Sequence, residues 1–313
     1  MNKRFISVAI AVFLLLPAMI FADGEKNQET IDIWAYFQAQ SEWTKDARTF
    51  SLGTSRIMVD GKIMKGISYS LQGQVSPTIQ VIHVNFSLDL FKNHSLTIGQ
   101  QSSPFKFFSP PPETKPTVVY PLGSLVSTFD DIGIALKGKM GPFSYQFLML
   151  NGKGANYKDD NKSKDATALM TFSPIKQFSL TGFWQGGYQE WTQQIEQRHY
   201  REGMWLQAKI KPVSGLTITP TWVRRNDRTQ ERDITYKREG WYVLTTYDVN
   251  QKLRVLAQYL KDANKETEWT IGLVFKKTNR MRTLLNGTLR KTLDGKTNLG
   301  LYIMTQFNVG KDL

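Results

Sequence analysis

Apolar and polar residues alternate with a period of two along most of this chain. The segment 31–43 shows this alternation, and so does the segment 216–222. It is clearest near the C-terminus, where one set of positions is apolar and the intervening set is mainly polar: Leu299, Leu301, Ile303, Thr305, Phe307 and Val309 against Gly300, Tyr302, Met304, Gln306 and Asn308. Because successive side chains of a strand point to opposite faces, this period predicts β-strands with one apolar and one polar face.

Clusters of Gly, Pro, Asn, Asp and Lys mark the ends of the alternating segments. Boundaries drawn at these clusters predict about sixteen strands, at residues 31–43, 49–59, 67–75, 79–89, 94–102, 130–139, 143–151, 165–173, 178–190, 201–211, 216–225, 235–247, 252–261, 267–276, 281–291 and 297–309. A tilted strand that crosses a membrane needs about 9–11 residues. The predicted strands have about this length.

The connections between the predicted strands alternate in length. Every second connection is tight, at residues 60–66, 90–93, 141–142, 174–177, 212–215, 248–251 and 277–280. Most of the others are longer and more polar, such as 152–164, 191–200 and 226–233. Short turns at one rim, longer loops at the other and an even number of strands are typical of outer-membrane barrels. The predicted fold class is therefore all-β, a transmembrane antiparallel β-barrel of about sixteen strands.

A soluble β-sandwich or solenoid is the alternative fold. Strands in such proteins average about 5–6 residues, which is shorter than the segments predicted here. Several Trp and Tyr residues also stand toward strand ends, as expected for the aromatic girdles of a membrane barrel: Trp43, Trp191, Trp241, Tyr247, Tyr259 and Trp269. Strand length and aromatic placement together favour the barrel.

Residues 1–22 have the pattern of a signal peptide. Lys3 and Arg4 precede an apolar run, and Ala22 stands before a polar stretch. A transmembrane anchor is the alternative, but the run is short for a membrane span. The chain has no cysteine, which excludes a lipid-anchored lipoprotein. We expect Sec-type export, removal of residues 1–22, and a barrel domain of residues 23–313 in the bacterial outer membrane.

One connection, residues 105–129, is longer than the rest and rich in proline and aromatic residues. Proline lacks the N–H that a strand ladder needs, so this segment is predicted to be a stiff loop. It is the third loop on the long-loop rim, and we expect it to fold inward as a constriction. The residues expected to form it are Phe105, Lys106, Phe107, Phe108, Pro110, Pro111, Pro112, Lys115 and Tyr120. An external flap or a latch between subunits is the alternative.

The formal net charge of +13 indicates a preference for anionic partners, and removal of Lys3 and Arg4 leaves +11. If the apolar positions face lipid, the opposite positions line a water-filled interior. Those positions carry many basic residues: Arg56, Lys137, Lys139, Lys209, Lys211, Arg225, Arg254, Lys276, Arg282 and Arg290. The acids expected to face them are few, chiefly Asp32, Asp89 and Asp131.

Six of these basic residues fall toward the short-turn rim, where they would form a basic vestibule: Lys139, Lys209, Lys211, Arg254, Lys276 and Arg282. A cationic wall lowers the barrier for anions and raises it for cations. The alternative for any one of them is a position beside the membrane, in contact with lipid phosphates.

Three stretches resemble the phosphate-selective porin family, the outer-membrane porins O and P. The first is Phe50–Arg56 followed by Gly61, and the second is Leu96–Gln100 followed by Pro104-Phe105. The third is Asp131–Ile134, followed by Gly138, Tyr145 and Asn151-Gly152. The resemblance implies a sixteen-stranded barrel, a homotrimer, an inward-folded third loop and passive uptake of anions, phosphate among them.

The sequence contains few residues that could form a catalytic or metal-binding site. The three histidines, His83, His94 and His199, are scattered, and without cysteine they form no compact set for a transition metal. Asp159 and Asp160 could hold Ca²⁺, although a solvated loop is the simpler interpretation. We therefore predict no enzymatic activity, no metal and no cofactor.

The function that these patterns predict is an anion-preferring channel for small solutes. The expected partners are small anions, outer-membrane lipid and lipopolysaccharide, and further copies of the chain; nucleic acid is not expected for an exported protein. Two alternatives stay open. One is a structural or adhesive barrel with a plugged lumen, and the other is a channel for hydrophobic substrates.

Overall fold

The computed structural model describes residues 30–44, 48–76, 78–104, 130–152, 154–156, 164–190, 198–229, 234–261, 266–278 and 280–309. The expected signal peptide, residues 1–22, lies outside the described residues, and so does the whole expected constriction loop, residues 105–129. Both therefore remain predictions.

The described chain is built from β-strands. They are β1 (Thr30–Thr44), β2 (Arg48–Leu52), β3 (Ser55–Met64), β4 (Ile67–Ser76), β5 (Gln80–Phe91), β6 (His94–Ser102), β7 (Asp130–Met140), β8 (Phe143–Leu150), β9 (Asp165–Ile175), β10 (Phe178–Glu190), β11 (Arg198–Ile210), β12 (Leu216–Thr229), β13 (Ile234–Asp248), β14 (Leu253–Lys261), β15 (Thr267–Thr278), β16 (Met281–Lys291) and β17 (Thr297–Val309). Among the described residues, no helix is long and apolar enough to cross a membrane.

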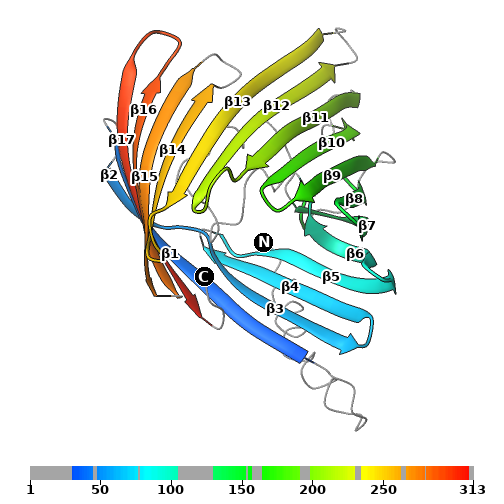
Figure 1. The fold of residues 1–313 in the computed structure, drawn as a ribbon. Helices are drawn as coiled ribbons and strands as arrows, with labels where there is room; N and C mark the ends of the chain where they lie inside the picture. The colour runs from blue at the N-terminus through cyan, green and yellow to red at the C-terminus, as the bar shows by residue number, and fades with distance from the viewer. Residues whose placement is uncertain are drawn as a thin grey trace.

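The strands form one closed antiparallel barrel. Each pairs with the next along the chain, and the first and last strands, β1 and β17, pair over ten residues from Ala35↔Val309 to Thr44↔Gly300. In Figure 1 the wall runs in chain order from the blue strands through green and yellow to red. β2 and β3 both pair with β1, one beyond the other, so they are two halves of a single barrel strand. The seventeen segments thus make sixteen barrel strands, as predicted.

The break between β2 and β3 falls at Gly53 and Thr54. The Gly53 N–H donates to the carbonyl of Gln38 at 2.9 Å, which holds the chain against β1. A Cβ at Gly53 would lie only 2.8 Å from Oε1 of Gln38, so this approach requires glycine. The prediction of one continuous strand at 49–59 was wrong in two respects. The strand is interrupted here, and it continues to Met64, so the predicted turn at 60–66 shortens to Lys65 and Gly66.

The two rims differ as the sequence predicted. One rim, named here the short-turn rim, carries the seven tight connections, including Lys92-Asn93 and Gly141-Pro142. Asn93 and Gly141 have φ values of 64° and 56°, a left-handed conformation that Asn and Gly adopt most readily in tight turns. The opposite rim, the long-loop rim, carries the remaining connections. The four strands β6, β10, β16 and β17 have the predicted boundaries to the residue.

The alternating residues separate into two faces of the wall. The outer phase exposes large apolar side chains, such as Leu299 at 70% and Ile271 at 67%. The inner phase holds polar side chains that are enclosed, such as Gln306 and Asn286, both 0% exposed. Gln306 and Asn286 lie on the same phase of neighbouring strands, opposite to the exposed apolar residues. The predicted period of two thus corresponds to an outer apolar face and an inner, mainly polar face.

Aromatic rings gather on the outer phase toward both rims. Near the long-loop rim, the ring of Tyr259 lies 5.1 Å from that of Trp241 and 4.5 Å from that of Trp269. Near the short-turn rim, Phe143 stacks on Phe172 at 4.7 Å. Amphipathic and aromatic side chains in two such bands suit the two interfaces of a membrane.

Candidate functional site: the inner wall of the barrel

The strand register places nine of the ten predicted basic residues on the inner phase, and Lys211 directly follows β11. Arg56 stands opposite Tyr36, Lys276 opposite Arg282, and Arg282 opposite the enclosed Gln306. The other inner-phase residues are Lys137, Lys139, Lys209, Arg225, Arg254 and Arg290. A role for these residues in lining a channel remains a prediction.

Five of them gather at the short-turn rim of the consecutive strands β11 to β16. This basic cluster consists of Lys209, Lys211, Arg254, Lys276 and Arg282. Lys209 is close enough to Lys211 and Arg254 for their charges to act on its ammonium group. Among the described residues, the inner phase at this rim of β11–β16 carries one carboxylate, Asp248.

Asp248 forms an ion pair with Arg254, so the positive charges of the other cluster residues are only partly neutralised. Nε of Arg254 donates to Oδ1 of Asp248 at 2.5 Å, and Nη2 donates to Oδ2 at 3.0 Å. The charge of Lys276 also acts on this carboxylate. One negative charge therefore faces five positive charges, and this part of the inner wall has a positive potential.

The remaining predicted basic residues are spread around the wall. Arg56 is only 8% exposed, and its Nε has no hydrogen-bond partner within the described part of the chain. Lys137 and Lys139 stand on β7 near the short-turn rim. Arg290 lies near the long-loop rim, where its Nε donates to Oε2 of Glu266 at 3.0 Å.

The prediction that few acids share the inner phase was wrong. Besides Asp32, Asp89 and Asp131, the register places further acids there, among them Glu42, Asp60, Asp165, Asp248 and Glu268. Several are held by hydrogen bonds rather than free in the lumen. Asp131 accepts from the N–H groups of Ile132 at 2.7 Å and Gly152 at 2.6 Å. These acids were missed because they lie near or just beyond the ends of the predicted strands. The alternation of apolar and polar residues is weakest there, so the sequence does not show which face an acid occupies.

The acids and bases are unequally distributed around the barrel. Asp32, Asp60 and Asp89 belong to β1, β3 and β5. The basic cluster occupies β11 to β16 on the other part of the wall, and Lys137 and Lys139 occupy β7. The inner wall therefore has a more acidic N-terminal sector and a more basic C-terminal sector.

Part of the inner wall is apolar, which the sequence analysis did not predict. The apolar patch consists of Phe183, Trp205, Val223, Tyr242 and Leu260, on β10 to β14, all 8% exposed or less. The rings of Phe183 and Trp205 stack with centroids 5.8 Å apart. The sequence does carry a signal for this patch, because the alternation of apolar and polar residues is lost there. Apolar neighbours such as Trp241-Tyr242 put apolar side chains on both faces of a strand.

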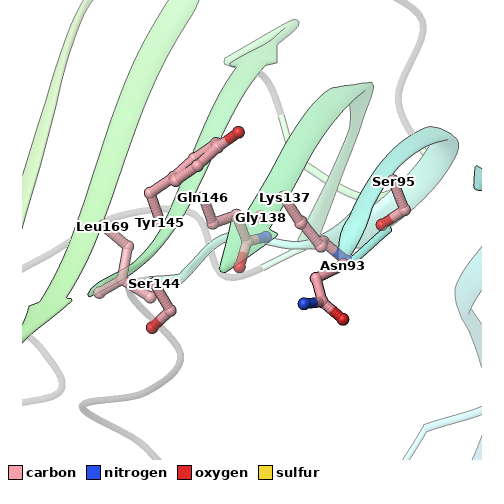
Figure 2. Close-up of a pocket in the computed structure, with 8 residues that line it drawn as sticks. All are labelled: Asn93, Ser95, Lys137, Gly138, Ser144, Tyr145, Gln146 and Leu169. Atoms are coloured by element: carbon pink, nitrogen blue, oxygen red, sulfur yellow. The ribbon is translucent and has the colours of Figure 1, made fainter. Parts of the chain in front are cut away.

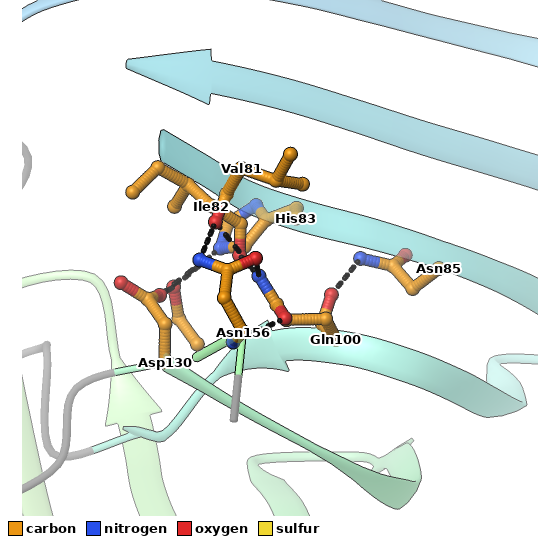
Figure 3. A network of polar contacts seen from close by, with 8 residues as sticks. Val81, Ile82, His83, Asn85, Gln100, Asp130 and Asn156 are labelled. Carbon is orange, nitrogen blue, oxygen red and sulfur yellow. Dashed lines mark hydrogen bonds and ion pairs between the residues drawn. The ribbon is translucent and has the colours of Figure 1, made fainter. Parts of the chain in front are cut away.

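A polar network ties the connection after β8 to β5 and β6 (Figure 3). Nε2 of Gln100 donates to the carbonyls of Val81 at 2.8 Å and Ile82 at 3.0 Å. The Asn156 N–H donates to Oε1 of Gln100 at 3.0 Å, and its Nδ2 donates to the Val81 carbonyl at 2.8 Å. These bonds hold Asn156 against the wall at the long-loop rim.

His83 contacts a serine and an aspartate, but not in the geometry of a hydrolase. Its Nε2 lies 2.6 Å from the Ser102 hydroxyl and 3.3 Å from Oδ1 of Asp130, and the hydroxyl donates to the same Oδ1 at 2.6 Å. In a catalytic triad the serine and the carboxylate bind opposite nitrogens of the imidazole. Here both oxygens approach the same nitrogen. The three side chains therefore link β5, β6 and β7 but do not have the arrangement of a catalytic triad.

Comparison with known proteins gives a match in structure alone. No known family model matches the sequence. No curated protein matches it either. Solved barrels superpose over nearly the whole chain. An anion-selective porin from Comamonas acidovorans matches with a TM-score of 0.72 at 11% identity, covering 90% of this chain and 100% of that chain.

Two further barrels match with similar coverage. The outer-membrane protein OmpT of Vibrio cholerae, in a trimer form, has a TM-score of 0.71 at 11% identity, covering 90% of this chain and 99% of that chain. The outer-membrane channel DcaP of Acinetobacter baumannii has a TM-score of 0.66 at 12% identity, covering 91% of this chain and 99% of that chain. The chain has a porin-type fold.

A porin-type barrel of this strand number encloses an interior too wide for side chains to fill, and water occupies the remainder. The charged inner phase faces that interior. The candidate surfaces for a solute are the basic cluster on β11–β16 and the polar wall around Lys137 on β7. Within the described residues, no group of three or more His, Asp or Glu side chains is arranged to hold a metal ion.

Proposed function

We propose that this chain is a porin of the bacterial outer membrane, forming a water-filled, anion-preferring channel for passive diffusion of small solutes. Oxyanions such as phosphate belong to the solutes that we expect to pass. The proposal includes Sec-type export with removal of residues 1–22, assembly as a homotrimer, and contact with outer-membrane lipid and lipopolysaccharide.

The observation that carries the proposal is the basic cluster. Four cationic side chains of the inner phase and Lys211, which directly follows β11, lie at one rim, with Asp248 as their one neighbouring carboxylate among the described residues. A cationic surface at a channel mouth concentrates anions and repels cations. Lysine and arginine also suit oxyanions, because their N–H groups donate charge-assisted hydrogen bonds.

The contribution of the segment 105–129 is part of this proposal. Folded into the lumen, its aromatic and proline residues would narrow the passage, and Lys106 and Lys115 would add positive charge there. The width of that constriction would set the size limit for solutes.

The deciding experiment is the reversal potential of the purified protein in a planar bilayer under a KCl gradient. We expect a sign that indicates chloride preference. The variant K209E/K211E reverses two charges of the basic cluster and should shift the potential toward cation preference. A matched control is K261E, because Lys261 pairs with Trp241 on the outer phase and should leave the potential unchanged.

Each outcome has a defined consequence. Cation preference of the natural protein would refute the anion-preferring channel. An absence of conductance would favour the structural or adhesive barrel with a plugged lumen. An unchanged reversal potential in K209E/K211E would mean that these side chains do not act on the permeating ions.

The apolar patch supports a second candidate, a channel for hydrophobic substrates. An apolar wall inside a barrel offers a surface to apolar solutes, which an entirely polar lumen does not. This candidate predicts little ionic current and inhibition of that current by apolar ligands. The two candidates are therefore separated in the same bilayer recording.

A further inference from the structure

A hollow opens in the inner wall between the turn after β5 and strand β9 (Figure 2). Its volume is about 270 Å³, and we name it the Lys137 niche after its one charged side chain. Its lining residues are Asn93, Ser95, Lys137, Gly138, Ser144, Tyr145, Gln146 and Leu169. Serines flank the lysine, and their short side chains leave the wall recessed around it.

The strand register explains how the niche is assembled. Ser95 on β6 stands opposite Lys137 on β7, Lys137 opposite Gln146 on β8, and Gln146 opposite Leu169 on β9. These four residues form one row across four strands on the inner phase. Ser144 lies on the next inner position of β8, opposite Lys139.

The electrostatics of the niche favour an anion. Lys137 is its one charged lining residue, and no carboxylate lines it. Within the described residues Lys137 makes no ion pair or hydrogen bond, so its ammonium donors are available. The amide and hydroxyl groups of Asn93, Ser144 and Gln146 add neutral donors without adding competing charge.

One end of the row is apolar. Leu169 is partly buried and packs against the apolar patch at Phe183 and its neighbours. It stands two strands away from Lys137, so a ligand that touches both must have a charged end and an apolar end. The volume lies below the range of about 300–1,000 Å³ typical of drug-sized pockets, so the ligand must be smaller than a drug-sized molecule.

We propose that the Lys137 niche binds a small carboxylate with an apolar body. The carboxylate accepts hydrogen bonds from the Lys137 ammonium and the neighbouring polar side chains, while the body lies against Leu169. This assignment deepens the proposed channel function and rests on it for access, because solutes reach the niche through the lumen. The niche would then be a binding site for monocarboxylates on the inner wall of the channel.

The test is binding of fluorobenzoate to the folded barrel in detergent micelles, followed by fluorine NMR, with fluoroacetate as the ligand that lacks a ring. We expect K137Q to weaken both ligands by about tenfold, the effect of losing a charged hydrogen-bond donor. We expect L169S to weaken fluorobenzoate several-fold and to leave fluoroacetate unchanged. K139Q is the matched control, because Lys139 lies on the same strand and phase but outside the niche.

The outcomes separate this proposal from the channel function. Equal affinity of fluorobenzoate for K137Q and the natural protein overturns the niche, even if the bilayer recordings show an anion channel. Equal losses in K137Q and K139Q overturn it as well, because a general effect of positive charge would explain them. Loss in K137Q alone supports the niche. This measurement needs no ionic current, so its result is distinguishable from a failure of the conductance experiment.

Discussion

Lys276 on β15 and Arg282 on β16 occupy directly opposite positions in the antiparallel ladder, and both belong to the inner phase. Like charges that face each other across two strands destabilise a sheet. Nearby, Asp248 neutralises part of this charge, but its hydrogen bonds go to Arg254. A destabilising pair at this position is understandable if the barrel functions through its positive charge.

The first prediction concerns this pair. K276E would place opposite charges face to face, so we expect the barrel to gain about 0.2–1 kcal/mol of stability. The same substitution should weaken the anion preference. Urea unfolding in lipid vesicles measures the first effect, and the reversal potential in a KCl gradient measures the second. A lower stability together with an unchanged potential would contradict our interpretation of the pair.

The second prediction concerns Gln306, which anchors Arg282. Nη2 and Nε of Arg282 donate to Oε1 of Gln306 at 2.9 and 3.3 Å, and Gln306 is fully enclosed. Q306L removes this acceptor and should cost about 1–3 kcal/mol in free energy of unfolding, because a buried charged donor loses its bond. Q306E keeps an acceptor and is the control. If both variants lose the same stability, packing rather than the hydrogen bond is responsible.

The third prediction tests the aromatic row near the long-loop rim. Tyr259 touches Trp241 on one side and Trp269 on the other, so Y259A removes two ring contacts. Aromatic pairs are worth about 0.5–1.5 kcal/mol beyond the area they bury. We therefore expect Y259A to lower the urea midpoint more than Y247A, since Tyr247 is an outer-phase tyrosine with no ring partner among the described residues. Equal effects would show that the row adds nothing beyond surface burial.

The fourth prediction concerns Asn156, which has a φ of 64° and binds β5 through its side chain. N156A loses the bond to the Val81 carbonyl and forces alanine into the left-handed region, so we expect a loss of about 2–3 kcal/mol. N156G loses the bond but adopts this φ without strain, and about 1 kcal/mol should be lost. Both values are measured by urea unfolding. An equal loss in the two variants would exclude a contribution from the backbone conformation.

Much of the fold could be predicted from the sequence because a strand with one lipid face and one aqueous face must alternate. The segment 297–309 does so over its whole length, and its boundaries were predicted to the residue. The segment 49–59 failed, because Gly53 breaks the strand through a close approach to Gln38 on β1. That approach depends on a neighbour more than ten residues away in the chain and has no periodic signature.

The inner wall was predicted in part for the same reason. Arg254 and Lys276 could be assigned to the inner phase because their own strands alternate regularly. The apolar patch could not, because Trp205 and Tyr242 stand beside other apolar residues and their phase is ambiguous in the sequence. The Lys137 niche was also missed, since Lys137, Gln146 and Leu169 become neighbours only through strand pairing.

The pairing of β1 with β17 has a consequence for how the barrel is made. Gln38 and Gln306, which meet across this seam, are 268 residues apart in the chain. Contacts of such separation form late, because the intervening chain must be ordered before they become favourable. Until the last strand arrives, β1 and the growing sheet both present unpaired edges that can pair wrongly. We therefore expect the wall to be completed late in assembly, and we expect a chain that lacks its last strand to remain an open sheet.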